Sequence, residues 1–96
     1  MKTLYESRVH DQNKSHDVIV VQENDVKMKM TYECYNAQER FTGDLFVNGK
    51  WEHFFSTLDL GIESNKSNYV KSEEFRKTRS TELRKLGIKF FNSIHK

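Results

Sequence analysis

A basic stretch near the C-terminus carries the strongest chemical pattern in the sequence. Residues 75–83 contain Arg76, Lys77 and Arg79, and no apolar side chain lies between the two ends of this stretch. The planar guanidinium group of arginine suits phosphate or carboxylate, which it binds through parallel hydrogen bonds. Together with Arg84, these residues predict a surface that binds an acidic partner or grips a nucleic-acid backbone.

Basic and aromatic residues in the middle of the chain form a second group of candidates. Lys27, Lys29 and Tyr35 share the polar face of an alternating stretch, and Trp51 belongs to a neighbouring stretch. Aromatic rings anchor protein interfaces, and in a basic surrounding they can also stack nucleic-acid bases. We therefore include these four residues among the predicted partner-binding residues.

No pattern in the sequence supports a catalytic or metal site. Asp44 and His53 could form an acid–base pair, but no nucleophile is placed beside them. The repeated His-Asp pairs at positions 10–11 and 16–17 match no metal-ligand spacing, and a single cysteine, Cys34, cannot form a zinc finger or an intramolecular disulfide. We expect a protein that is not an enzyme, with no metal and no cofactor.

Charge is distributed unevenly along the chain. The formal net charge is +2, but residues 1–64 carry seven basic against eleven acidic side chains, and residues 65–96 carry nine against three. Two interpretations follow from this separation. Either the two parts pack and neutralise each other, or the basic C-terminal part is a functional surface.

The elements that must position these residues begin with a β-hairpin. Residues 17–22 include four β-branched residues in a row, which predicts a strand buried on both faces or central to a sheet. A turn follows at residues 23–25. Residues 26–35 then alternate strictly, with Met28 and Tyr32 on the face expected to meet the core.

A second hairpin surrounds Asn48-Gly49, a pair typical of the tight type I′ turn. Residues 40–47 and 50–58 are its predicted strands. A two-residue loop sets the register between them. The predicted cross-strand pairs are Phe46 with Trp51, Asp44 with His53, Gly43 with Phe54, and Thr42 with Phe55.

The C-terminal segment reads as a helix with Ser72 as its N-cap. Gly87 allows two continuations, a helix stop followed by a strand, or one continued helix, and we favour the continued helix. At helical spacing Arg76 and Arg79 lie on the same side as Leu83, Leu86, Phe90 and Ile94. Because a buried unpaired charge is costly, we expect the arginine-bearing half to extend beyond the core, or its arginines to meet the acidic groups of a partner.

These elements predict one α+β domain spanning residues 1–96. Residues 1–16 are expected to form an edge strand plus loop, 17–58 two β-hairpins, 59–71 a connector, and 72–95 the helical segment. The fold is an antiparallel β-meander of four to five strands with the basic C-terminal helix packed on one face. An open sheet edge could also pair two subunits as a homodimer.

The absence of a targeting pattern and of any long apolar run favours a cytoplasmic protein without membrane contact. Abundant Lys and Asn with no Pro suggest an A/T-rich gene, such as that of a low-GC bacterium, a phage or a mobile element. We expect a non-catalytic protein-binding modulator, a small adaptor or inhibitor whose partner is a protein. The alternative is a nucleic-acid-binding module that uses the basic C-terminal segment.

Overall fold

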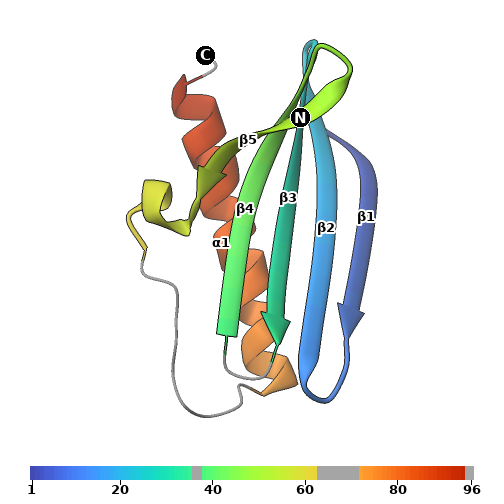
Figure 1. Cartoon of the computed structure of the whole chain (residues 1–96), viewed down its shortest axis with the longest axis vertical. Helices are drawn as coiled ribbons and strands as arrows, with labels where there is room; N and C mark the ends of the chain where they lie inside the picture. Colours follow the sequence, from blue (N-terminus) through green and yellow to red (C-terminus); the bar gives the residue numbers. More distant parts are fainter. Residues whose placement is uncertain (36–37, 63–71, 95–96) are drawn as a thin grey trace.

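The computed structural model describes residues 1–35, 38–62 and 72–94. Five strands follow one another along the chain and pair in that order as one antiparallel meander (Figure 1). The α+β class and the C-terminal helix are confirmed. The elements are β1 (Lys2–His10), β2 (Lys14–Glu23), β3 (Val26–Tyr35), β4 (Gln38–Val47), β5 (Lys50–Ser56), a short 3-10 helix η1 (Thr57–Leu60) and helix α1 (Glu73–Ile94).

The β2–β3 hairpin follows the predicted pattern closely. Asn24 in its turn has a positive φ of 56°, which asparagine tolerates well. The alternating stretch forms β3, and Met28 and Tyr32 are 0% and 1% exposed on the face that meets the core. The β-branched run of β2 lies in an internal strand, but only Val21 within it is buried. Of the two predicted alternatives, a strand central to the sheet is confirmed, and burial on both faces is wrong.

The β4–β5 hairpin contains a bulge that the sequence did not reveal. Phe46 faces Trp51 and Asp44 faces His53, as predicted. The register then shifts by one residue, so that Gly43 faces Phe55. The predicted pairs of Gly43 with Phe54 and of Thr42 with Phe55 are wrong, because a bulge places an extra residue on one strand. That extra residue, Phe54, packs its ring against Phe90 and Phe91 of α1.

The first hairpin is longer than the sequence indicates. Residues 1–16 were expected to form an edge strand plus loop, but β1 continues to His10 and β2 already begins at Lys14, which leaves only residues 11–13 between them. Ser15 and Asp17 lie on the core face and are 1% and 0% exposed. Polar residues on a buried face conceal a strand from a hydrophobicity pattern, and here they have polar partners on the helix.

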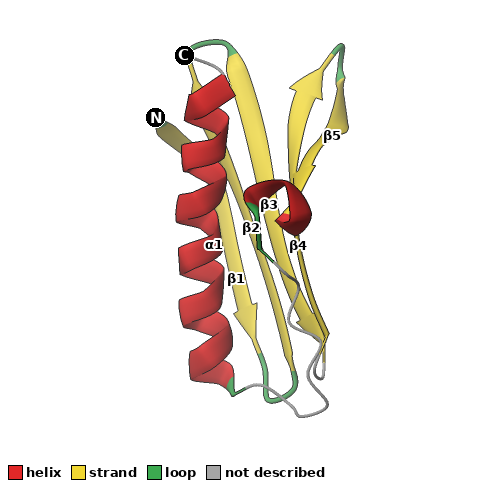
Figure 2. Ribbon diagram, turned by 90° about the vertical axis from the view of Figure 1, so that its left-hand side faces the viewer, coloured by secondary structure: helices red, strands yellow, loops and turns green. Residues whose placement is uncertain are grey.

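Helix α1 covers one face of the sheet along its length (Figure 2). Ser72 caps it through its hydroxyl, which accepts a hydrogen bond from the Phe75 amide at 3.1 Å. The helix continues through Gly87, as predicted. A β-carbon at position 87 would lie 2.7 Å from Met30 Sδ and 2.9 Å from Phe55 Cζ, so glycine allows the helix to approach the sheet closely.

The core lies between α1 and the sheet. The stripe of α1 that faces the sheet differs from the predicted one, because Gly87 and Phe91 are buried whereas Leu86 and Ile94 are 38% and 53% exposed. Toward the N-terminal end of the helix, the buried stripe continues with polar side chains, namely Arg76, Ser80 and Arg84. The buried apolar residues are Val21, Met28, Met30, Tyr32, Cys34, Phe41, Phe55, Leu83 and Phe91.

The contact between Gly43 and Phe55 can be tested by substitution. A β-carbon at position 43 would lie 2.2 Å from Cε2 of the Phe55 ring. We expect Gly43→Ala to lower the free energy of unfolding by about 2 kcal/mol through overpacking, measured by urea denaturation. In a Phe55→Leu background the same change should cost less, because the ring is gone. An equal cost in both backgrounds would contradict this explanation.

Candidate functional site

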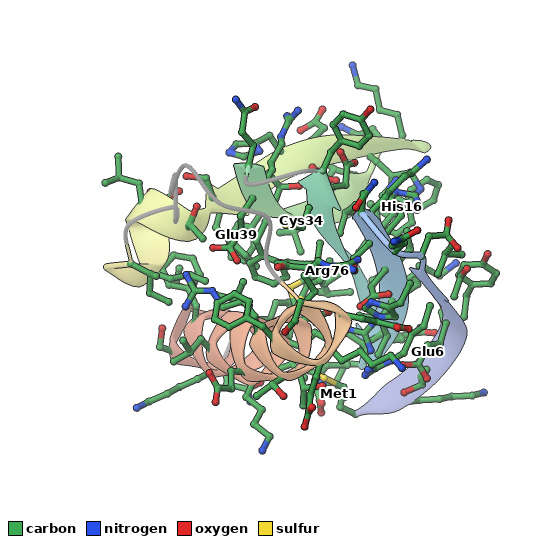
Figure 3. The ribbon with its side chains drawn as sticks, turned by 90° about the horizontal axis from the view of Figure 1, so that it is seen from below. Met1, Glu6, His16, Cys34, Glu39 and Arg76 are labelled. Atoms are coloured by element: carbon green, nitrogen blue, oxygen red, sulfur yellow. The ribbon has the colours of Figure 1, made fainter. Side chains whose placement is uncertain are left out.

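Arg76 was predicted to face a partner, but it is fully buried between α1 and the sheet (Figure 3). It donates hydrogen bonds to the Ser15 hydroxyl at 2.6 Å and to the carbonyl oxygens of Asp11 and Gln12 at 2.7 and 3.1 Å. The first residues of α1 therefore hold the β1–β2 loop in place. The expectation that this half of the helix extends beyond the core is wrong, because its charges have partners inside the fold.

Arg79 forms an ion pair with a buried carboxylate on β4. Its Nε and Nη2 donate to Glu39 at 2.9–3.1 Å, and the Glu39 side chain is 0% exposed. The Tyr32 hydroxyl donates to the same carboxylate at 3.0 Å. Two causes raise the pKa of Tyr32: burial is the larger, and the negative charge of Glu39 is the second. The hydroxyl therefore stays protonated and can donate the hydrogen bond. The hydrogen bond to Glu39 also raises the pKa of Arg79.

Arg84 pairs with the edge strand β1. Its Nη1 donates to Glu6 Oε2, and Arg8 donates to the same oxygen at 3.1 Å. The Arg84 side chain is 8% exposed, so it too is largely unavailable to a partner. These two hydrogen bonds hold the pKa of the Glu6 carboxyl below its ordinary value, and the one from Arg84 has the larger effect.

A serine, a histidine and an aspartate come together beneath the helix. His10 Nδ1 lies 2.7 Å from Ser15 Oγ, and His10 Nε2 lies 3.0 Å from Asp17 Oδ1. The serine hydroxyl also accepts a hydrogen bond from Arg76 and is 1% exposed, so no substrate can reach it. Ser80 donates to the other oxygen of Asp17 at 2.6 Å. We assign this group a structural role that joins the helix to β1 and β2.

The solvent side of α1 carries no surplus of positive charge once these arginines are accounted for. Lys77 is exposed, as predicted, and forms an ion pair with Glu73 at 3.3 Å. Between residues 73 and 94 the exposed charged side chains are three lysines and three glutamates. The basic surplus of the helix is thus directed into the fold. The charged residues on its surface are Glu73, Glu74, Lys77, Glu82, Lys85 and Lys89.

The other predicted residues all lie on the second face of the sheet. Among the described residues no helix covers this face, and we call it the open face (Figure 2). The strand registers place Lys27, Lys29 and Tyr35 of β3 on it together with Trp51 of β5. Further open-face residues are Lys2, Tyr5, Ser7, Val9, Lys14, His16, Val18, Val20, Glu33, Arg40, Asp44, Phe46 and His53.

Two lysines lie over two aromatic rings at one end of the open face. The ammonium group of Lys29 lies 4.8 Å from the centroid of the Trp51 ring, and that of Lys27 lies 5.5 Å from the centroid of Phe46. The two rings are tilted against each other with centroids 5.2 Å apart. These distances suit cation–π attraction, so the four side chains form one basic-aromatic cluster.

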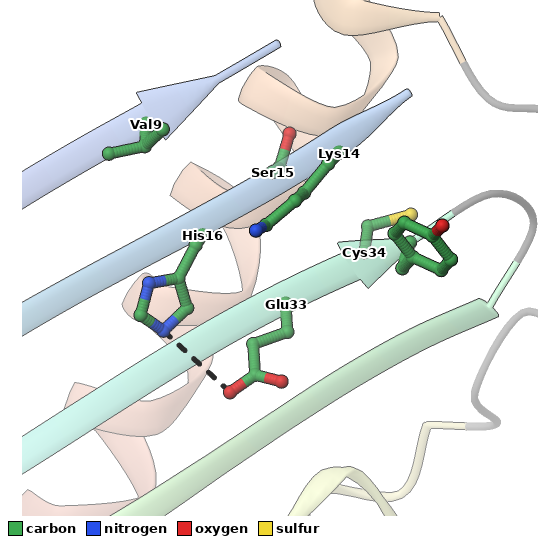
Figure 4. Close-up of a pocket in the computed structure, with 7 residues that line it drawn as sticks. Val9, Lys14, Ser15, His16, Glu33 and Cys34 are labelled. Carbon is green, nitrogen blue, oxygen red and sulfur yellow. Dashed lines mark ion pairs between the residues drawn. The ribbon is translucent and has the colours of Figure 1, made fainter. Parts of the chain in front are cut away.

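Tyr35 lies at the opposite end of β3 and lines a shallow hollow in the open face. Figure 4 shows this hollow with its labelled residues, among them Val9, Lys14 and His16. The hollow has a volume of about 470 Å³, and its lining includes Val9, Lys14 and the ion pair of His16 with Glu33. Tyr35 is 65% exposed, so its ring is available to a partner. The open face therefore offers two separate binding features.

The open face carries a net positive charge. Five of its side chains are basic, namely Lys2, Lys14, Lys27, Lys29 and Arg40, and two, Glu33 and Asp44, are acidic, which leaves a formal charge of +3. The predicted site residues did not include Lys14, His16 or Arg40, nor Phe46, although its pairing with Trp51 was predicted. The alternation of β4 indicates Arg40 and Phe46. Lys14 and His16 could have been found only by recognising that β2 already begins at residue 14.

Comparison with protein-family models, with curated proteins and with solved structures finds no match for this chain. Within the described ranges no helix is long and apolar enough to cross a membrane. In the same part of the chain no group of three or more His, Cys, Asp or Glu side chains could hold a metal ion.

The buried ion pair predicts that Arg79 acts in folding. We expect Arg79→Ala to lower the free energy of unfolding by about 3 kcal/mol, because it breaks an ion pair to a buried carboxylate. Lys77→Ala is the matched control. It removes an exposed pair and should cost less than about 0.5 kcal/mol in the same chemical denaturation. Similar values for both variants would show that the pair does not hold the helix.

The lowered pKa of Glu6 predicts an acid-dependent contribution to stability. The charged form is favoured in the folded state, so its contribution is present above the unfolded pKa of about 4.3 and is lost as pH falls through the folded pKa. Since the side chain is 43% exposed, we expect Glu6→Gln to cost at most about 1 kcal/mol at pH 7.

Denaturation of both proteins between about pH 2 and pH 7 measures this difference, which should disappear at the acidic end. Glu52→Gln, which removes an exposed carboxylate 3.9 Å from Lys50, is the control and should be nearly neutral throughout. A difference between wild type and Glu6→Gln that persists at the lowest pH would contradict the assignment.

Proposed function

We propose that this chain is a non-catalytic protein-binding modulator, an adaptor or inhibitor that binds its partner through the open face. The observation that supports this most directly is the cluster of Lys27, Lys29, Phe46 and Trp51, which brings positive charge and large rings together on a face that no described element covers. Tryptophan and tyrosine supply much of the binding energy in protein interfaces. The surplus of positive charge favours a protein partner with an acidic surface.

The alternative, nucleic-acid binding through the basic C-terminal segment, has less support in the described residues. The three helix arginines contact Glu39, Glu6 or the β1–β2 loop, and the outer side of α1 is electrically balanced. Lys66, Lys71 and Lys96 lie outside the described residues. On the open face, Lys29 lies over the ring on which a base would stack.

A charge-reversal experiment separates these functions. We expect the wild-type chain to capture a partner protein from nuclease-treated lysate of the source organism. The variant Lys27→Glu/Lys29→Glu should no longer capture that protein. The matched control, Lys85→Glu/Lys89→Glu on the outer side of α1, should retain it. Trp51 is the single tryptophan, so its emission reports binding of the purified partner. Affinity should fall at least about tenfold in the open-face variant, equal to 1.4 kcal/mol.

Equal capture by both variants would contradict the proposed site. Anisotropy titrations with random-sequence single-stranded DNA and RNA complete the test. Binding that weakens steeply with salt and is lost in Lys27→Glu/Lys29→Glu would replace the protein partner with nucleic acid.

A further inference from the structure

We propose that β1 is a self-complementary edge through which two copies of this chain pair as a symmetric dimer. In the described sheet β1 and β5 are the two edge strands. The β5 edge is the shorter one, it carries the bulge beside Gly43, and it leads directly into η1, all of which discourage pairing. Strand β1 has a register shift of its own between Thr3 and Tyr5, so residues 5–10 remain as the longer regular edge.

The hydrogen-bonding pattern of β1 shows which backbone groups are available. The Asp11 amide bonds to the Lys14 carbonyl at 2.7 Å, and the register continues from there as Val9 with His16 and Ser7 with Val18. Bonded and non-bonded pairs alternate in an antiparallel ladder. The amides and carbonyls of the intervening residues, Glu6 and Arg8, therefore point away from β2 toward the edge.

Among two-fold axes through the central residues Glu6, Ser7 and Arg8, the side chains favour one register for a second copy. If the two-fold axis passes through Ser7, Glu6 lies opposite the partner subunit's Arg8, and Arg8 lies opposite the partner subunit's Glu6. An axis through Glu6 or through Arg8 would instead place like charges directly opposite each other, which is unfavourable. The side chains of Glu6 and Arg8 are 43% and 39% exposed, so both can reach across the edge.

The same register matches apolar side chains on the open face. Tyr5 is 56% exposed and Val9 is 43% exposed. With the axis through Ser7, Tyr5 lies opposite the partner subunit's Val9, and Val9 lies opposite the partner subunit's Tyr5. An aromatic residue opposite a β-branched residue is a favourable cross-strand pair. Opposite charges thus meet on the helix side of the sheet while apolar groups meet on the open side.

The two helices leave room for this arrangement. Antiparallel pairing about an axis normal to the sheet keeps both helices on one side, and α1 packs mainly over β2 and β3. At about 4.8 Å between strands, two such helices would lie roughly 19 Å apart, well beyond the 8–10 Å of a packed pair. The result is one continuous ten-stranded sheet whose two open faces adjoin. This inference does not rest on the proposed function, because it needs no target.

Cysteine cross-linking tests the register. The Ser7 residues of the two copies would form a non-hydrogen-bonded pair with Cα atoms about 4.5 Å apart, within the range for a disulfide. Ser7→Cys should therefore form a disulfide-linked dimer under mild oxidation. The native Cys34 is 1% exposed and should give little background. Tyr5→Cys is the matched control, since its two copies would lie four residues apart along the strands, about 13 Å.

Two further measurements complete the test. A mixture of Tyr5→Cys and Val9→Cys should form a mixed disulfide, because these positions face each other across the axis. Sedimentation velocity of the wild-type chain over an about hundredfold concentration range should show a shift from monomer to dimer. Monomer at every concentration, or equal cross-linking at positions 5 and 7, would overturn the proposal.

Discussion

Three carboxylates on the sheet fix how the helix lies. Glu6 on β1, Asp17 on β2 and Glu39 on β4 receive hydrogen bonds from Arg84, Ser80 and Arg79. Because Asp17 and Glu39 are almost wholly buried, their charges would be costly without these partners. Three anchor points on three strands determine both the rotation and the position of α1. The apolar contacts at Leu83, Gly87 and Phe91 then close the other half of the helix onto the sheet.

This arrangement also decides which charges reach the solvent. The helix arginines are used inside the fold, so the strong separation of charge along the sequence largely disappears when the two parts pack together. Of the two interpretations of that separation, neutralisation within the fold accounts for Arg76, Arg79 and Arg84. Among the described residues, the surplus of positive charge that remains on the surface lies on the open face, where Lys27 and Lys29 accompany the aromatic rings. In the described part of the chain, the open face is therefore the surface that favours an acidic partner.

Local rules predicted much of this fold, and long-range pairs account for the rest. The alternation of β3, the Asn48-Gly49 turn and the Ser72 cap each depend on neighbouring residues, and all three are confirmed. The bulge at Phe54 depends on how the helix packs, and the partner of Arg79 is Glu39, forty residues away. Neither relation is visible in periodicity. Of the candidate site, the open-face residues were placed correctly on one surface, whereas the arginines were misjudged because their acids lie on distant strands.

Large rings on the open face lie next to water, and the two lysines partly cover them. A lysine over a ring covers apolar surface with its methylene groups while its ammonium group stays hydrated. A partner carboxylate that bound Lys29 could draw the ammonium group aside and uncover Trp51 for contact. Charge would then guide the encounter, and ring burial would supply the affinity. A neutral apolar surface lacks the first of these steps, so the proposed site would discriminate among partners by their charge.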